Sequence, residues 1–180
     1  MLRRGFLVLM LAVAAAGCDN DSPTAPADPN VVVFTAQLSA ANEVPAITNA
    51  EAAARGNVRI SVNLSRDAGN NITGATYNFV VNLNSFPPGS TWTLAHIHEG
   101  AAGVAGGVRV NTGLSSATAI ALTDGSITGQ TFSNIPFNPT VNPNAIDLIN
   151  QMITNPNGFY FNVHSSLNGG GAVRGQLAKQ

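Results

Sequence analysis

The strongest constraint on the fold of this chain is an alternation of apolar and polar residues with a period of two. Residues 58–64 read VRISVNL, so that an apolar side chain occupies every second position. The same alternation marks residues 34–38 and residues 75–83. Because successive side chains of a β-strand point to opposite sides of a sheet, this spacing predicts strands that bury one face. The polar segment between residues 58–64 and residues 75–83 contains Gly69, so these two strands are predicted to form a hairpin with a long loop.

Further short strands are expected along the rest of the chain, separated by Gly, Pro and Asn. They fall at residues 93–98, 107–110, 117–122, 129–132, 159–164 and 172–178. Many short strands with frequent turns are typical of an antiparallel sandwich or barrel, so the predicted fold class is all-β. One late segment differs, because Ile146, Ile149 and Ile153 have helical spacing and Asn144 is a suitable N-cap. We therefore expect one helix of about ten residues there.

The first 17 residues have the layout of a secretory signal. Arg3 and Arg4 precede an apolar run, and small residues then lead to Cys18, the only cysteine. The segment AAGC resembles the cleavage box of bacterial lipoproteins, in which the cysteine is lipidated. An ordinary signal peptide that is cleaved near Ala16 is the alternative. Either reading predicts a protein that works outside the cytoplasm, and lipidation of Cys18 would anchor it to a membrane surface.

Residues 18–30 are rich in Asp, Pro and small side chains, and a segment of this composition cannot bury enough surface to fold. We predict that it is a flexible tether in front of a single domain at residues 31–180. Without Arg3 and Arg4, six basic residues oppose nine acidic ones, and Lys179 is the only lysine. This charge balance argues against nucleic-acid binding, which needs a basic surface.

The chain has three histidines, His96, His98 and His164. On a strand, residues two apart face the same side about 6.5–7 Å apart, so His96 and His98 project together. Parity along residues 159–164 likewise places His164 on the face opposite the apolar side chains. Three imidazoles that meet in this way can bind Zn²⁺ or Cu²⁺, with a fourth position for water or a carboxylate. The competing interpretation is that the histidines form hydrogen bonds that fix the glycine-rich loop at residues 100–107.

No catalytic residues are predicted. None of the serines lies in a GxSxG turn, no close pair of carboxylates suggests glycosidase chemistry, and the glycine-rich loop lacks the Lys and Ser/Thr of a phosphate-binding loop.

Three motifs resemble those of the CHRD domain family, named after the animal protein chordin. Residues 37–45 (QLSAANEVP) resemble its opening motif, residues 94–110 (LAHIHEGAAGVAGGVRV) its central motif, and residues 159–177 (FYFNVHSSLNGGGAVRGQL) its closing motif. The resemblance implies an immunoglobulin-like antiparallel sandwich or barrel, a CHRD domain at residues 31–180, and a secreted or surface location. Residues 137–156, which hold the expected helix, then form an insertion late in the domain.

Two charged residues in these motifs could meet. One hypothesis is that Glu43 and Arg174 form an ion pair that closes the first strand against the last. The rival hypothesis is that Glu43 joins the histidines as a metal ligand.

Two functions remain open. The first is a lipid-anchored CHRD-domain protein of the bacterial cell envelope that acts as a binding or structural module toward an envelope or extracellular protein. The alternative is a protein that binds one copper or zinc ion through the three histidines and has superoxide-dismutase-like or metal-carrying activity. The HIH strand is similar to that of copper–zinc superoxide dismutase, although three histidines cannot build its full two-metal site.

Overall fold

The computed structural model describes residues 28–180. The predicted signal at residues 1–17, Cys18 and all but the end of the predicted tether lie outside the described residues. Within residues 28–180, no helix has both the length and the apolar character needed to cross a membrane.

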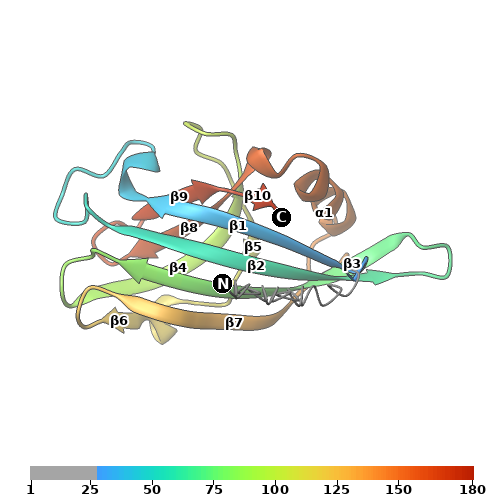
Figure 1. Cartoon of the computed structure of the whole chain (residues 1–180), viewed down its shortest axis with the longest axis horizontal. Helices are drawn as coiled ribbons and strands as arrows, with labels where there is room; N and C mark the ends of the chain where they lie inside the picture. Colours follow the sequence, from blue (N-terminus) through green and yellow to red (C-terminus); the bar gives the residue numbers. More distant parts are fainter. Residues whose placement is uncertain (1–27) are drawn as a thin grey trace, which may run out of the picture.

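The described chain forms one antiparallel sheet that curls into a nearly closed barrel (Figure 1). Its strands are β1 (Val31–Ser39), β2 (Arg55–Arg66), β3 (Ile72–Asn84), β4 (Ser90–Glu99), β5 (Val108–Asn111), β6 (Ile120–Leu122), β7 (Ile127–Phe137), β8 (Phe159–Ser165), β9 (Val173–Gln176) and β10 (Ala178–Lys179). The order across the sheet is β5-β4-β8-β9-β1-β2-β3-β7, with β10 beside β1 and β6 beside β4. The all-β prediction is therefore confirmed, and each predicted strand region contains a strand. The region at 117–122 is strand only over Ile120–Leu122, because Ser116–Thr118 form a short 3-10 helix.

The hydrophobic core fills the inside of the barrel, on the face that the alternation predicts. Every second residue of β2 from Val58 to Leu64 and of β3 from Ala75 to Leu83 is buried. Aromatic rings join the two halves of the sheet, because Phe79 of β3 packs against Phe161 of β8 with ring centroids 5.7 Å apart. Burial of these large side chains provides the main driving force for closing the barrel.

The one α-helix within residues 28–180, α1 (Ala145–Thr154), confirms the helix expected from the isoleucine spacing. Leu148, Ile149 and Met152 are buried, and the helix packs against β3. The Tyr77 hydroxyl of β3 lies 3.9 Å from the Met152 sulfur, and burial raises the pKa of this hydroxyl well above its usual range. Figure 1 shows that α1 covers one end of the barrel, so it seals the core there and leaves the opposite end to loops.

Strand β8 differs from the other long strands because all seven of its residues are buried. Phe159, Phe161 and Val163 belong to the hydrophobic core, whereas Tyr160, Asn162 and His164 face the outside of the barrel. Those outward side chains are buried because loops cover them. One is the glycine-rich loop 100–107, whose Gly106 bonds Tyr160, and another is the turn at 166–171, whose Gly169 bonds His164. Parity thus predicts the direction of the outward side chains, but not their burial.

Candidate metal centre

The three histidines meet on the outer face of the β4–β8 pair. His96 lies opposite Asn162 in the sheet register, His98 lies opposite Tyr160, and His164 lies opposite Leu94. His96 and His98 are two residues apart on β4, and His164 reaches them diagonally from β8. All three are buried, with only 6–7% of each residue exposed. The fold therefore brings the three imidazoles together on one face, as the sequence predicts.

The ring nitrogens are close enough to share one ion. His96 Nδ1 lies 3.2 Å from His164 Nε2, and one nitrogen from each ring lies within 4.8 Å of those of the other two. In a tetrahedral zinc site with bonds of about 2.0–2.1 Å, neighbouring nitrogens are about 3.3 Å apart. One edge of the triangle therefore already has the spacing of a metal site, and the other two, which are at most 4.8 Å, would shorten by up to about 1.5 Å on binding.

Two backbone carbonyls fix the orientation of two of the rings. His98 Nδ1–H donates to the Gly106 carbonyl at 2.9 Å, and His164 Nδ1–H donates to the Gly169 carbonyl at 3.0 Å. A carbonyl oxygen can only accept, so these bonds put the proton on Nδ1 and leave a lone pair on Nε2. Such bonds to the second ring nitrogen are the usual support of metal-binding histidines. The bond of His98 also fixes the glycine-rich loop, as the competing interpretation predicts.

The environment keeps the imidazoles neutral. Burial, together with smaller contributions from the nearby His164 and His98, lowers the pKa of His96 to about 4. Burial also lowers the pKa values of His98 and His164, although their carbonyl partners oppose this. Neutral imidazole is the form that binds metal, so the rings are in their ligating state at neutral pH.

An aromatic ring and a guanidinium extend this polar face along β8 and β9. The Tyr160 ring stacks on His98 with centroids 5.0 Å apart and planes within 13°. On β9, the guanidinium carbon of Arg174 lies 4.5 Å from the centroid of the same Tyr160 ring. The Tyr160 hydroxyl accepts a hydrogen bond from the Gly106 amide. Tyr160 therefore supports His98 directly and ties it to the loop above.

The structure corrects the expected role of Glu43. Glu43 and Arg174 line the same pocket, but within residues 28–180 the only salt bridge joins Arg109 to Glu99. Arg174 instead donates from Nε to the Asn42 carbonyl at 2.6 Å and from Nη1 to the Val104 carbonyl at 3.0 Å. The predicted direct ion pair is thus replaced by bonds to backbone oxygens. Glu43 is also not a member of the three-histidine cluster.

Burial raises the pKa of the Glu43 carboxyl to about 7, and the charge of Arg174 opposes this rise only in part. The opposite charges therefore influence each other across the pocket without a direct contact.

A buried polar cluster that sequence reasoning missed holds the turn beside His164. Glu51 is almost fully buried, and its carboxylate accepts hydrogen bonds from Ser165 Oγ and Asn168 Nδ2, both at 2.6 Å. These bonds join the 43–54 segment to the turn whose Gly169 carbonyl orients His164. Nothing in the alternation marks Glu51, because it lies in a segment without regular secondary structure.

These features define a class of protein: an all-β barrel domain with a buried, loop-covered cluster of three histidines on its outer face. The sequence pattern of the CHRD domain matches residues 34–177, and the chain belongs to the CHRD domain family. Neither the curated proteins nor the solved structures contain a match to this chain. The match includes His96, His98, His164, Glu43 and Arg174.

Proposed function

We propose that this CHRD-domain protein is an extracytoplasmic metal-binding protein that holds one Cu²⁺ or Zn²⁺ ion through His96, His98 and His164. The observation that carries the proposal is that one nitrogen from each of the three imidazoles lies within 4.8 Å of those of the other two, on two adjacent, paired strands. Burying three imidazoles together costs desolvation energy. Coordination of an ion by their lone pairs would offset that cost.

The nitrogens best suited to bind the ion are those left free by the backbone bonds. These are Nε2 of His98 and Nε2 of His164. Nδ1 of His96 would be the third ligand: without metal it donates to His164 Nε2 at 3.2 Å, and on binding its proton would move to the other nitrogen of the His96 ring. Within the described chain, His98 Nε2 is a buried atom without any hydrogen-bond partner, which is consistent with a ligand position. A three-nitrogen set favours Cu²⁺ over Zn²⁺ in affinity, and it leaves a coordination position open for water or another ligand. An open position suits either superoxide-dismutase-like or metal-carrying activity.

The location is part of the same proposal. The signal layout of residues 1–17 and the family membership both support a place outside the cytoplasm. We propose that lipid on Cys18 anchors the protein to a membrane of the cell envelope and that residues 18–30 form a tether for the domain. An envelope or extracellular protein would then be the partner of the domain.

The test uses protein from residues 31–180 without a histidine tag, because the only three histidines are those of the site. Cu²⁺ and Zn²⁺ are titrated into wild type and into the His96→Ala, His98→Ala and His164→Ala variants. We expect one tight equivalent in wild type and a loss of at least tenfold in affinity in each variant. Asp124→Asn serves as the control, because it removes an exposed carboxylate far from the histidines in the sequence. Wild-type affinity equal to that of the histidine variants would refute the metal site.

A second candidate is the binding or structural module, and the loop contacts favour it. His98 and His164 each fix a loop through a carbonyl, so the trio could serve only to shape the outer surface for a protein partner. In that case the alanine variants would show faster amide hydrogen exchange in residues 100–107 and 166–171. Wild type would show the same exchange rates with and without added metal. Protection that increases with metal in wild type alone would instead support the metal site.

A further inference from the structure

The pocket next to Arg174 holds two buried charged groups whose hydrogen bonds are incomplete. This pocket has a volume of about 460 Å³. Its polar lining comes mainly from Asn42, Glu43, Arg174 and Gln176, and its apolar lining from Ala41, Val44 and Ala102. Arg174 is 2% exposed and Glu43 is 8% exposed. Within the described residues, Arg174 Nη2 and Glu43 Oε1 make no hydrogen bond to the protein.

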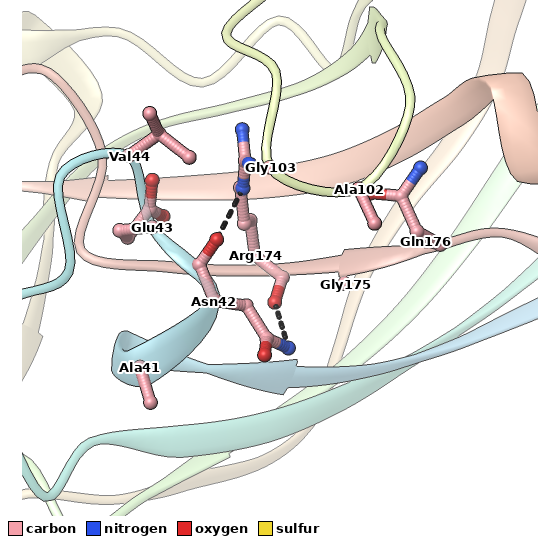
Figure 2. Close-up of a pocket in the computed structure, with 9 residues that line it drawn as sticks. All are labelled: Ala41, Asn42, Glu43, Val44, Ala102, Gly103, Arg174, Gly175 and Gln176. Carbon is pink, nitrogen blue, oxygen red and sulfur yellow. Dashed lines mark hydrogen bonds between the residues drawn. The ribbon is translucent and has the colours of Figure 1, made fainter.

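The guanidinium is held rigidly in a position that leaves this nitrogen free. Its Nε and Nη1 are fixed by the Asn42 and Val104 carbonyls, and one face rests on the Tyr160 ring. Figure 2 shows the side chain of Arg174 rising from β9 between the Glu43–Val44 segment and the loop at Gly103. Its remaining donor, Nη2, is buried beside the pocket, so a ligand that displaces the adjacent side chains slightly would meet a donor whose orientation is already fixed.

The two charges do not neutralise each other by contact. No salt bridge joins them, although they are opposite in sign and line one pocket. Buried polar groups are almost always paired, and buried charges without partners are costly. A group that accepts from Arg174 Nη2 and donates to Glu43 Oε1 would satisfy both atoms at once.

We propose that this pocket binds a small zwitterion, with the ligand carboxylate on Arg174 and the ligand ammonium on Glu43. When Glu43 is ionised, the pair has no net charge, which matches a ligand that carries one charge of each sign; a ligand ammonium beside Glu43 would itself favour the ionised form. The methyl groups of Ala41, Val44 and Ala102 favour a small apolar side chain on the ligand. Free α-amino acids and short peptides both carry this chemistry, and they differ in the spacing of their two charges.

The experiment titrates ¹⁵N-labelled residues 31–180 and follows the amide signals of the pocket glycines Gly103 and Gly175. A chelator is present throughout, so binding cannot run through a metal ion held by the histidines. The probes are L-alanine, L-alanyl-L-alanine, acetate and ethylamine. We expect saturable shifts with one of the first two at an affinity about tenfold or more above acetate or ethylamine, because only a zwitterion uses both charges. The stronger of the two identifies the ligand as a free amino acid or a peptide.

Variants test whether the changes in amide signals arise from ligand binding at Arg174 Nη2 and Glu43 Oε1, the two pocket atoms without a hydrogen bond. Glu43→Gln and Arg174→Lys should each weaken binding about tenfold or more. The exposed Asp124→Asn and Arg59→Lys should leave it unchanged. Because Arg174 also holds two loops, Ala102→Phe provides an independent test: it fills the pocket from an exposed position and should abolish the shifts in a folded protein.

The proposal is refuted if neither zwitterion gives saturable shifts, or if acetate alone binds as well as the zwitterions. It is equally refuted if the pocket variants bind like wild type. Because the chelator removes metal, none of these outcomes depends on whether the histidines bind an ion. Failure of the metal site and failure of the zwitterion pocket are therefore separate results.

Discussion

The two faces of β8 are equally buried, but different kinds of interaction bury them. The inner face, with Phe161 and Val163, packs into a continuous hydrophobic core. The outer face, with Tyr160 and His164, is covered by loops that form hydrogen bonds to these two side chains. Burial alone therefore does not distinguish a structural residue from a functional one. What distinguishes them is whether their polar atoms have partners.

The buried polar side-chain atoms that lack a hydrogen bond all lie outside the hydrophobic core of the barrel. In the described chain there are four such atoms: Glu43 Oε1, His98 Nε2, Asn162 Oδ1 and Arg174 Nη2. His98, Asn162 and Arg174 come from three neighbouring strands, since His98 lies on β4, Asn162 on β8 and Arg174 on β9. Native proteins leave few such atoms unpaired, so their concentration on one face marks that face as the region where ligands would bind.

The largest expected effect is the difference in stability between a variant of the inner face and a variant of the outer face. Phe161→Ala should lower the free energy of unfolding by about 3–5 kcal/mol, because it leaves a cavity in the core. His164→Ala in metal-free protein should cost about 1 kcal/mol, since it removes modest hydrogen bonds from a face that loops cover. Urea denaturation of both variants in the presence of a chelator measures the difference. Equal losses would mean that the outer face contributes to the core as much as the inner one, and the comparison would fail.

Sequence reasoning predicts the inner face well and the outer face only in part. The alternation over Val58–Leu64 specifies which side chains enter the core, because a strand with one buried face must repeat every two residues. The same parity brings the three histidines together. It could not show that loops 100–107 and 166–171 cover them, because irregular segments carry no periodic signal.

The contacts of Arg174 illustrate the limit most clearly. The sequence suggests Glu43 as its partner, since charges are rare in this chain. The structure instead gives it two backbone carbonyls and the Tyr160 ring. Backbone acceptors are present at every residue, so their position depends on how the loops fold. Glu51 escaped prediction for the same reason, because its partners Ser165 and Asn168 lie far away in the sequence.

The second prediction uses pH to separate the cost of burying a histidine from the cost of burying a carboxyl group on the outer face. Burial lowers the pKa of His96 from its ordinary 6.5 to about 4 in the folded protein. Between pH 6.5 and pH 4, His96 is protonated in the unfolded chain but stays neutral in the folded protein. The free energy of unfolding therefore falls as the pH drops from 6.5 toward 4. The loss from this group is up to about 3 kcal/mol, from 1.36 kcal/mol per pKa unit. Urea denaturation of metal-free His96→Gln should show a shallower fall over this range.

Glu43 provides the control of opposite sign. Its folded pKa is raised from 4.5 to about 7, so its contribution is fully present below pH 4.5 and is lost as pH rises through 7. Glu43→Gln should therefore stabilise the metal-free protein at pH 8 relative to wild type, and the gain should vanish near pH 4. A His96→Gln profile parallel to wild type, or a Glu43→Gln gain that persists at pH 4, would contradict the assigned burial costs.

The last prediction tests how tightly the outer face is packed around one glycine, and its expected effect is smaller than those of Phe161→Ala and of the pH change. Gly171 has a φ of 140°, a conformation that L-residues rarely adopt. An added Cβ there would lie 2.7 Å from Glu43 Oε2 and 2.8 Å from Asn162 Nδ2. Gly171→Ala should therefore cost about 2 kcal/mol through backbone strain and displacement of those side chains.

The adjacent Gly170 is the matched control, because a Cβ there would meet nothing within 4 Å. Gly170→Ala should leave the free energy of unfolding nearly unchanged, and both variants can be compared in urea. If Gly171→Ala displaces Glu43 and Asn162 as the geometry implies, amide signals of residues 42–44 should shift in that variant and not in Gly170→Ala. Equal stability of the two variants would show that the side chains around Gly171 move aside at little cost. The missing hydrogen bonds of Glu43 Oε1 and Asn162 Oδ1 would then reflect loose packing and not a preformed ligand site.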